Sequence, residues 1–313
     1  MSIASALLPT IELGLSPDGL DAVHDLMLDS LRKTALGPVI DELSGAIGGG
    51  KMLRARLTLK VGSATDAPRD TLRRAAAAVE MVHAASLLHD DVIDGGLLRR
   101  GVPSFWKKKS VSGAILLGDL LVCKAVQMLD GIENGRLGGM LVRQAAEMCD
   151  AEAEQELVIH GNTKVPGFAG GCAGANWAKG VSVARRKTGS LFAFAAAATD
   201  GSDEKRGAAL LEAGYRIGTA YQLADDLMDA CGEPVRDGKD LGKDALNGKL
   251  TSVSALRRTN MLVLQSIRDL REDSLRLLIA WPVLQNAWNE YLANDFDPVI
   301  ALFAGEYSGT SPS

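Results

Sequence analysis

Residues Thr71 to Ile93 read TLRRAAAAVEMVHAASLLHDDVI, and their apolar side chains follow one clear period. Leu72, Ala75, Val79 and Val82 recur at three- and four-residue steps. This is the period of an amphipathic helix, because residues at those steps lie on one helical face. The stretch therefore predicts a long α-helix that packs against a core.

The same period continues along most of the chain. It predicts further helices at Gly113–Leu129, Met140–Ile159, Val181–Thr199, Asp203–Leu227 and Leu262–Leu292. No segment shows the alternation typical of strands, and the glycine-rich breaks between helices are short enough to be connectors. We therefore predict an all-α fold with one domain over residues 1–313 and a frayed C-terminal tail from about residue 306.

Composition excludes several classes of protein. The chain has 313 residues, 47% hydrophobic and 23% charged, which is typical of a globular protein and not of a disordered one. Its formal net charge of −5 argues against nucleic acid as the main partner, since phosphate binding favours a basic surplus. The 4% aromatic content also makes base-stacking platforms a poor interpretation.

Cysteine usage and hydropathy indicate a cytoplasmic protein. The four cysteines lie far apart and predict buried, reduced thiols: Cys123, Cys149, Cys172 and Cys231. The N-terminal sequence lacks the basic region of a signal peptide. No apolar run approaches the roughly 20 residues that a membrane span needs, so we expect no transmembrane segment.

Two clusters of aspartates, which we call acidic boxes, lie within these apolar helical segments. The first is His89-Asp90-Asp91-Val92-Ile93-Asp94, and the second runs from Gln222 to Asp229 as QLADDLMD. In each box the carboxylates lie one turn apart on a shared helical face, and such hard oxygen ligands suit Mg²⁺. One box alone is most often a solvated face. Two boxes, each followed by cations, predict a metal-dependent diphosphate site.

Further cations occur at helix starts and along the first acidic helix. Lys51 and Arg54 lie one turn apart after Gly48-Gly49-Gly50, whose exposed backbone N–H groups suit an anion. His83 precedes Asp90 by two turns on the same face. Lys187-Thr188-Gly189 opens another apolar helix and offers a cation and a hydroxyl group to a phosphate. Each of these motifs taken alone is also compatible with an ordinary surface or core residue.

Together the motifs resemble those of the trans-isoprenyl diphosphate synthases, the polyprenyl synthetase family. The sequences G-G-K-x-x-R, H-D-D-x-x-D, K-T-G and Q-x-x-D-D-x-x-D occur in the family's order between about Gly49 and Thr251. The resemblance implies a bundle of antiparallel helices around a deep apolar cavity, usually a homodimer, with three Mg²⁺ ions. It also implies condensation of isopentenyl diphosphate with an allylic prenyl diphosphate to give a longer all-trans product.

The resemblance assigns a role to each matching residue. The diphosphate of isopentenyl diphosphate would be bound by Lys51, Arg54, His83 and Arg100. The metal ions would be held by Asp90, Asp91, Asp94, Asp225, Asp226 and Asp229. The allylic diphosphate would be bound by Arg99, Lys187, Thr188, Gln222, Lys239 and Lys249. The residues expected to promote ionisation are Asp90, Asp91, Asp94, Lys187 and Asp225.

Three places depart from the family pattern. Ala55 follows Arg54 where the family usually has proline, Ala151 replaces a usual glycine, and residues 166–177 are rich in glycine. These departures bear on local helix geometry and remove no expected ligand.

Product length depends on the residues below the metal site. Ala85 and Ser86, five and four residues before Asp90, are small and leave the wall of the cavity open. We therefore favour a product longer than C15. Phe194, seven residues after Lys187, is either a floor of the cavity or an ordinary core residue.

Four alternatives remain open. A class I terpene cyclase also ionises a prenyl diphosphate but needs no isopentenyl diphosphate subsite, so Lys51, Arg54 and His83 argue against it. The same cations argue against a head-to-head synthase. A regulatory subunit would have no reason to keep both acidic boxes, and a purely structural bundle leaves their charges unexplained.

Overall fold

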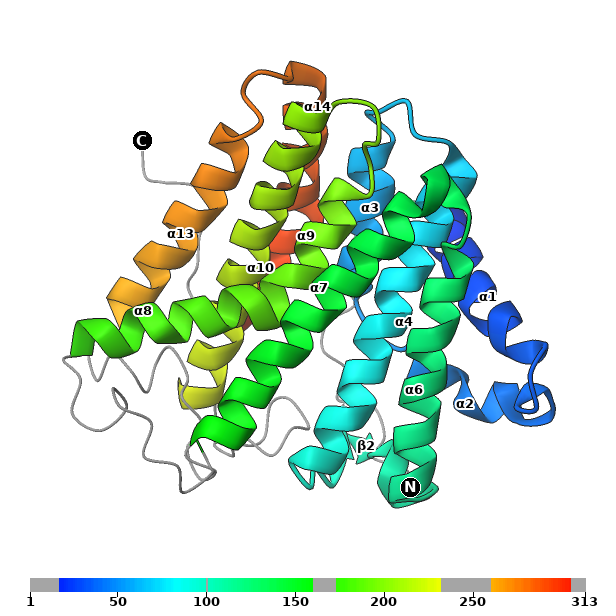
Figure 1. Ribbon diagram of the computed structural model, residues 1–313. Coiled ribbons are helices and arrows are strands. Elements are labelled where there is room, and N and C mark those ends of the chain that lie inside the picture. The colour runs from blue at the N-terminus through cyan, green and yellow to red at the C-terminus, as the bar shows by residue number, and fades with distance from the viewer. Residues whose placement is uncertain (1–16, 100, 160–172, 232–259, 305–313) are drawn as a thin grey trace, which may run out of the picture.

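The computed structural model describes residues 17–99, 101–159, 173–231 and 260–304. Most of these residues are helical, so the predicted all-α fold is confirmed (Figure 1). The strands within this part of the chain are a two-residue pair, β1 (Leu98–Arg99) and β2 (Val102–Pro103), joined antiparallel. Arg100, Cys172, Lys239, Lys249, residues 166–172 and the tail from about residue 306 lie outside the described residues.

Within each described range, the helices follow one another with short connections. The α-helices are α1 (Pro17–Arg32), α2 (Ile40–Ile47), α3 (Leu53–Gly62), α4 (Arg69–Ile93), α5 (Phe105–Lys108), α6 (Val111–Met128), α7 (Arg136–Ala153), α8 (Ala173–Ala184), α9 (Ser190–Ala197), α10 (Glu204–Cys231), α13 (Asn260–Arg276), α14 (Pro282–Tyr291) and α15 (Asp297–Ala304). Three π-helical segments interrupt them: η3 (Glu154–Ile159), η4 (Arg185–Gly189) and η5 (Leu292–Phe296). Two 3₁₀ turns, η1 (Gly37–Val39) and η2 (Ile132–Gly135), are also present in the described residues.

Two predicted helices are broken in the structure. The segment predicted at Leu262–Leu292 divides into α13 and α14, because Pro282 has no backbone N–H group and begins a new helix. The segment predicted at Val181–Thr199 belongs to α8, η4 and α9, and α8 is strongly inclined to α9 in Figure 1. The N-terminal helices α1, α2 and α3 lie outside the predicted segments, although their apolar residues join the core.

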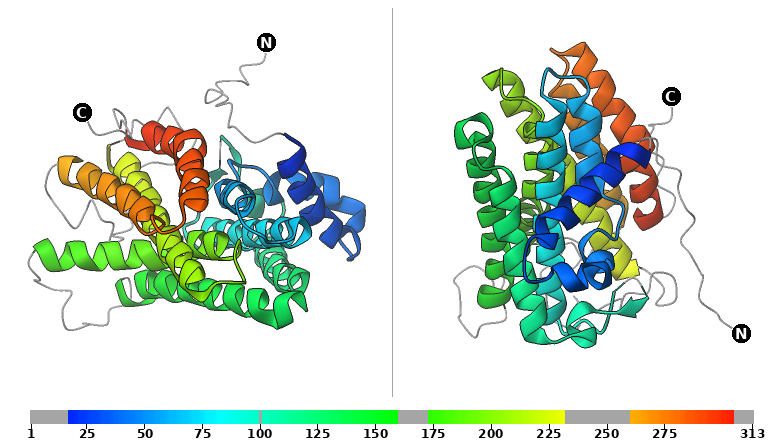
Figure 2. Two further views of the ribbon diagram at one scale, coloured as in Figure 1. Left: turned by 90° about the horizontal axis from the view of Figure 1, so that it is seen from above. Right: turned by 90° about the vertical axis from the view of Figure 1, so that its right-hand side faces the viewer.

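Helix α4 is the central element of the bundle. It packs on α1, α3, α6 and α9 (Figures 1 and 2). Ala75 to Ala78 are completely buried, so this alanine run serves close helix packing. The ring of His89 covers Gly118 of α6, where an added Cβ atom would lie 2.2 Å from His89 Nε2. Small residues therefore set the short distance between α4 and its neighbours.

Helix α6 departs from the prediction that no apolar run is long enough to span a membrane. By length and composition, Val111–Met128 is the described helix that meets the requirement, and 28% of it is buried. Ile115 and Leu116 are exposed on it. The expectation of buried cysteines is wrong for two of the four, since Cys123 on α6 and Cys149 on α7 are exposed free thiols.

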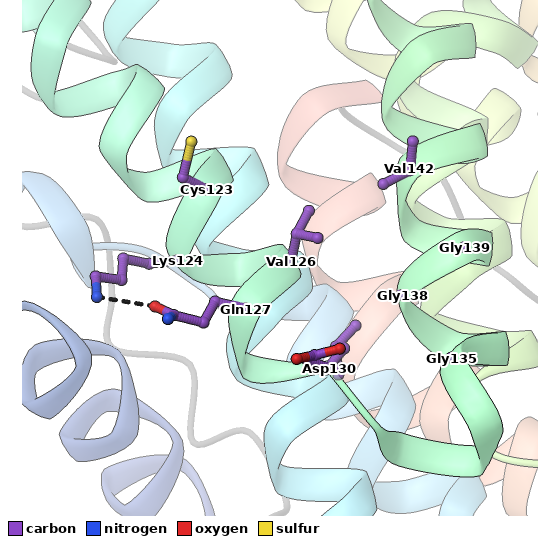
Figure 3. Close-up of a pocket in the computed structure, with 10 residues that line it drawn as sticks. Cys123, Lys124, Val126, Gln127, Asp130, Gly135, Gly138, Gly139 and Val142 are labelled. Atoms are coloured by element: carbon purple, nitrogen blue, oxygen red, sulfur yellow. Dashed lines mark hydrogen bonds between the residues drawn. The ribbon is translucent and has the colours of Figure 1, made fainter.

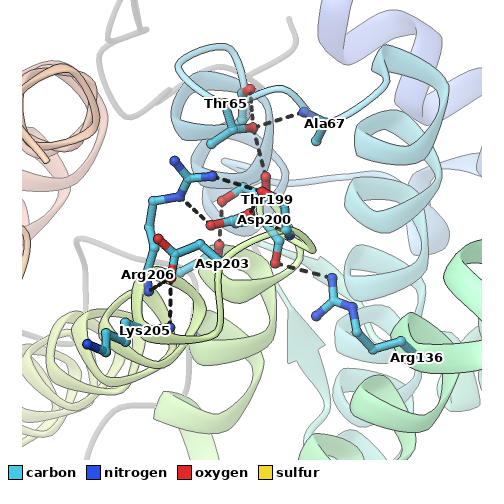
Figure 4. A network of polar contacts seen from close by, with 11 residues as sticks. Thr65, Ala67, Arg136, Thr199, Asp200, Asp203, Lys205 and Arg206 are labelled. Atoms are coloured by element: carbon cyan, nitrogen blue, oxygen red, sulfur yellow. Dashed lines mark hydrogen bonds and ion pairs between the residues drawn. The ribbon is translucent and has the colours of Figure 1, made fainter.

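A polar network closes one end of the bundle (Figure 4). The Thr65 hydroxyl donates to the Thr199 carbonyl at 2.7 Å, and Arg136 Nη2 donates to the Asp200 carbonyl at 3.2 Å. The Asp200 carboxylate, 2% exposed, pairs with Arg206. Burial raises the pKa of Asp200, but hydrogen bonds from Arg206 and Ser202 outweigh that effect and lower the pKa to about 2.

We expect Asp200→Asn to lower the free energy of unfolding by about 2 kcal/mol at pH 7. Because the folded pKa lies below the unfolded value, the carboxylate stabilises the fold above about pH 4 and loses this effect as the pH falls towards 2. In urea unfolding curves, the difference in the free energy of unfolding between the wild type and the variant should be about 1 kcal/mol smaller at pH 3 than at pH 7.

Asp29→Asn is the control, because Asp29 pairs with Arg32 on the exposed surface. That variant should change the free energy of unfolding by less than about 0.5 kcal/mol. An equal loss of unfolding free energy in the two variants would contradict the stabilising role of the ionised Asp200 carboxylate. So would a difference between Asp200→Asn and the wild type that does not depend on pH.

Candidate functional site

The first acidic box forms the C-terminal end of α4. The helix ends where the Asp94 N–H group donates to the Asp90 carbonyl at 2.8 Å and Gly95 follows with φ of +61°. Asp91 is 6% exposed. Arg99 Nε donates to its two oxygens at 2.9 and 2.8 Å, and Arg99 Nη2 lies 2.8 Å from Oδ1. The β1–β2 pair thus returns Arg99 to the end of the helix that carries the box.

The outer carboxylates of this box, Asp90 and Asp94, are partly exposed. Burial, together with the nearby carboxylates of Glu152 and Asp94, raises the pKa of Asp90 to about 6 against the opposing charge of Lys187. Negative charge is therefore crowded at this point. A divalent cation bound there would relieve that crowding.

The second acidic box lies near the C-terminal end of α10. Asp226 is 7% exposed and accepts a hydrogen bond from Gln222 Nε2 at 2.7 Å. Gln222 Oε1 in turn accepts one from the Thr188 hydroxyl at 2.5 Å. Asp225 and Asp229 are only partly buried. In both boxes, then, the second aspartate is buried and paired, while the first and last remain accessible.

The donor set of the boxes fits Mg²⁺. Within the described ranges, no group of three or more His, Cys, Asp or Glu side chains is arranged to hold a metal ion by itself. Mg²⁺ usually takes one or two carboxylates from a protein and completes its octahedron with water and substrate phosphate oxygens. Each box offers two accessible carboxylates and no soft ligand, which agrees with that preference.

The π-helical segment η4 carries three basic side chains, each of which meets different partners. Arg185 pairs with Glu212 at 2.6 Å and Arg186 pairs with Asp150 at 2.8 Å. Lys187 pairs with Glu152 and donates to Gln155 Oε1 at 3.2 Å. The sequence analysis missed Glu152 and Gln155 as site residues. Glu152 and Gln155 are three residues apart, which places them on one face of a helix and was the available signal in the sequence. Nothing in the local sequence, however, connects this pair with Lys187.

Glycines bring η4 and α9 against α10. An added Cβ atom at Gly214 would lie 2.5 Å from the Phe192 carbonyl oxygen. One at Gly218 would lie 2.6 Å from the Gly189 Cα atom and 3.0 Å from the Phe192 side chain. Only hydrogen fits at these contacts. The close approach places Thr188 within hydrogen-bond distance of Gln222 and hence beside the second box.

Lys51 and Arg54 lie at the start of α3. Arg54 is 7% exposed, and its Nε atom is buried without a hydrogen-bond partner among the described residues. Burial lowers the pKa of its guanidinium, and the nearby Glu80 carboxylate opposes that shift. A buried guanidinium with an unsatisfied donor is suited to bind an anion. The sequence analysis missed Glu80, which lies on α4 three residues before His83.

Three aromatic rings lie between the side chains of Arg54 and Lys51. Arg54 lies 4.7 Å from the ring centroid of Phe192, and Lys51 Nζ lies 4.6 Å from that of Phe303. Tyr221 stands between these rings, at 5.8 Å from Phe192 and 5.4 Å from Phe303. We call Phe192, Tyr221 and Phe303 the aromatic stack. It comes from α9, α10 and α15 and was not expected from the sequence.

The helix wall below the first box has the expected small residues. Ala85 is buried and Ser86 is partly buried. Phe194 on α9 is completely buried within the hydrophobic core. His83, two turns before Asp90, is partly buried.

One pocket lies away from all of these residues (Figure 3). It is lined by the end of α6 and the start of α7, including Cys123, Val126, Gly138 and Val142. Since α6 runs antiparallel to α4, the pocket lies at the opposite end of the bundle from the first acidic box (Figure 1). It holds none of the predicted site residues.

Comparison with known proteins agrees with these motifs. The polyprenyl synthetase family model matches residues 38–271, about three quarters of the chain. This chain belongs to the polyprenyl synthetase family. It is 32% identical over 206 residues to heptaprenyl diphosphate synthase component 2 of Bacillus subtilis, covering 65% of this chain and 56% of the relative. It is also 32% identical to geranylgeranyl diphosphate synthase of Mycobacterium tuberculosis, covering 67% of this chain and 59% of the relative.

The fold agrees with that membership. A polyprenyl synthase from Caulobacter crescentus, solved with calcium and isoprenyl diphosphate, superimposes with a TM-score of 0.72 and 25% identity. That match covers 91% of this chain and 94% of the other. The two curated relatives are covered over less than two thirds of their length, 56% and 59%.

The departures from the polyprenyl synthetase pattern have local explanations. The Ala55 N–H group, which a proline would lack, donates to Glu80 Oε1 at 2.9 Å inside the first turn of α3. Ala151 is completely buried and continues α7. Neither residue breaks its helix. Of the glycine-rich residues 166–177, those from Ala173 onward are described and begin α8.

We expect Gly218→Ala to lower the free energy of unfolding by about 1–3 kcal/mol, because its methyl group would force η4 and α10 apart. Urea unfolding curves measure this loss. Gly207→Ala on the same helix is the matched control, since its Cβ atom would meet nothing closer than 3.8 Å. That variant should gain up to about 1 kcal/mol from helix propensity. Equal effects at the two positions would contradict the close contact.

Proposed function

We propose that this protein is a head-to-tail prenyltransferase that condenses isopentenyl diphosphate with an allylic prenyl diphosphate to give a longer all-trans prenyl diphosphate. The observation that carries the proposal is the pair of cations on the aromatic stack. Lys51 and Arg54 stand at opposite ends of three rings, and the buried Arg54 Nε atom has no hydrogen-bond partner in the described part of the chain. The diphosphate of isopentenyl diphosphate would accept a hydrogen bond from this Nε atom, and His83 and Arg100 would be further ligands of the same diphosphate.

The allylic diphosphate would bind between the two boxes. Asp90, Asp94, Asp225 and Asp229 would hold Mg²⁺, with Asp91 and Asp226 as the buried supports described above, and we expect three ions. Mg²⁺ supplies positive charge that favours departure of the diphosphate. Lys187 and Arg99 now pair with carboxylates, and both would exchange these partners for phosphate oxygens. Thr188 and Gln222, with Lys239 and Lys249 from outside the described residues, complete this half of the site.

The reaction needs no separate protein base. The allylic C–O bond breaks and its electron pair leaves with the diphosphate. The double bond of isopentenyl diphosphate attacks the allylic carbon, and the new cation loses a proton to the released diphosphate. The chain's own task is to hold the two diphosphates apart, neutralise their charge and exclude water from the cation.

Two alternatives explain less of the structure. A class I terpene cyclase would use the acidic boxes but leave Lys51 and Arg54 without a ligand. A regulatory subunit would have no use for accessible carboxylates at two helix ends. The small Ala85 and Ser86 support a product longer than C15, whereas Phe194 as a floor would give a shorter one.

We expect the purified protein to elongate dimethylallyl, geranyl or farnesyl diphosphate with labelled isopentenyl diphosphate and Mg²⁺, and EDTA to abolish the reaction. Asp90→Asn should lower kcat by at least about 100-fold, because an outer carboxylate of the box is lost. Lys51→Ala should mainly raise the KM for isopentenyl diphosphate, because its proposed contact is present before the reaction. Chromatography of the dephosphorylated products measures both rate and length.

The outcomes separate the alternatives. Products of C25 or more would support the open wall, and a stop at C15 or C20 would point to Phe194, whose substitution by alanine should then lengthen the product. Mg²⁺-dependent release of diphosphate without elongation would favour the cyclase. If no allylic starter gives elongation or release of diphosphate, the regulatory subunit would be favoured.

We further propose that the protein is a homodimer that uses the exposed face of α6. Leu116 is 67% exposed on this apolar helix, and Val142 is exposed on the neighbouring α7. The pocket of Figure 3 lies on the same two helices. An apolar helix with 28% of its residues buried favours a protein partner that covers it, and a second copy is the simplest one.

We expect Leu116→Glu to produce monomers, because it would bury a charge in the interface. Light scattering after size-exclusion chromatography measures the mass. Val283→Glu is the control, since Val283 is 70% exposed on the distant α14 and its substitution should leave the dimer intact. A wild-type monomer would overturn the proposal.

We also propose a cytoplasmic location. Cys123 and Cys149 are free thiols, which suits a reducing compartment. Cell fractionation with immunodetection tests this, and recovery in the membrane fraction would direct attention to α6 as an anchor.

A further inference from the structure

The turn before α3 carries Lys51 in a backbone geometry that needs support. Met52, the next residue, has φ of 47° and ψ of 43°, in the left-handed region. A residue with a side chain pays about 1–2 kcal/mol for this conformation. The turn persists because other groups hold it. Those groups therefore determine where the Lys51 side chain begins.

Two hydrogen bonds hold this turn. Arg56 Nε donates to the Lys51 carbonyl at 2.9 Å. The Tyr291 hydroxyl donates to the Leu53 carbonyl at 3.1 Å. Arg56 lies one turn further along α3, whereas Tyr291 belongs to the end of α14. The turn is thus held in part from a distant region of the chain.

The guanidinium of Arg56 is itself fixed by a buried carboxylate. Arg56 Nη1 lies 3.2 Å from Asp295 Oδ1, and Lys60 Nζ lies 2.8 Å from Asp295 Oδ2. The Asp295 side chain is completely inaccessible, while those of Arg56 and Lys60 are 13% and 10% exposed. Removing a buried partner of this kind leaves an uncompensated charge, so the arrangement has little freedom to shift.

The C-terminal segment that contains Tyr291 and Asp295, residues 291–303, also contacts the Lys51 side chain. Phe303 on α15 supports the Lys51 ammonium group at 4.6 Å. Residues 291–303 therefore contact the Lys51 turn from three sides: through Tyr291, through Asp295 by way of Arg56, and through Phe303.

We propose that Asp295 is a positioning residue of the isopentenyl diphosphate subsite. By anchoring Arg56, it holds the carbonyl of Lys51 and so aims the Lys51 ammonium group at the diphosphate. This inference deepens the proposed function and depends on it, since it takes Lys51 as a ligand of isopentenyl diphosphate. It predicts an effect on the KM for isopentenyl diphosphate only, because the ion-pair partners of Asp295 in the described part of the chain are Arg56 and Lys60, and neither acidic box nor Lys187 is among them.

The test is Asp295→Asn, which keeps the shape of the side chain and removes its charge. The KM for isopentenyl diphosphate should rise roughly tenfold, while kcat and the KM for the allylic diphosphate stay within about twofold. Arg56→Met is the second variant. It removes the donor to the Lys51 carbonyl but leaves Asp295 paired with Lys60, so it disturbs the fold less and should raise the same KM.

Asp297→Asn is the matched control. Asp297 begins α15 and pairs with Arg271 of α13 at 2.7 Å, so this variant loses a largely buried ion pair from the same segment without touching Arg56. Its KM for isopentenyl diphosphate should match the wild type, even if its melting temperature falls as far as that of Asp295→Asn.

Two results would overturn the inference. One is an unchanged KM for isopentenyl diphosphate in Arg56→Met, and the other is an equal rise in Asp297→Asn, which would mean general loosening of the segment. Lys51→Ala separates this failure from that of the proposed function. If Lys51→Ala raises the KM and the positioning variants do not, only the inference fails; if Lys51→Ala leaves it unchanged, the assignment of Lys51 itself is wrong.

Discussion

A charge buried in a helical bundle costs several kcal/mol unless an opposite charge or a hydrogen bond from another element meets it. Much of the geometry described above follows from that constraint. Arg99 returns on the β1–β2 pair to meet Asp91, and Glu152 of α7 meets Lys187 of η4. Each pair links two different elements of the fold. The result is a set of helix ends whose remaining carboxylates and cations are held at defined places.

The same constraint separates supporting residues from accessible ones within each motif. Asp91 and Asp226 occupy equivalent places in the two boxes, and both are buried and paired. Their neighbours stay accessible because the helix turns them toward solvent. A motif with adjacent aspartates thus provides one buried, hydrogen-bonded residue and others that can bind a ligand.

The sequence predicts local features well here and distant ones poorly. The period of α4 and the one-turn spacing of its carboxylates are local, so they are visible without a structure. The break before Pro282 is also a local feature, because proline has no backbone N–H group to continue a helix. By contrast, Glu80 meets the Ala55 N–H group from a different helix, and no periodicity reveals that contact. The contacts of the π-helical turn η4 are equally hidden, because the partners of Arg185, Arg186 and Lys187 lie on other helices.

The two proposed halves of the site are built from different helices, and this division has a consequence for specificity. The isopentenyl half uses α3, α4 and the C-terminal segment, whereas the allylic half uses η4, α10 and the end of α4. They meet at the aromatic stack, where Tyr221 directly precedes Gln222 and contacts both Phe192 and Phe303. The wall of Ala85, Ser86 and Phe194 carries none of the buried ion pairs described above. Substitutions there would leave both sets of charges in place, so under the proposed function they would change the length of the product without changing how either diphosphate is bound.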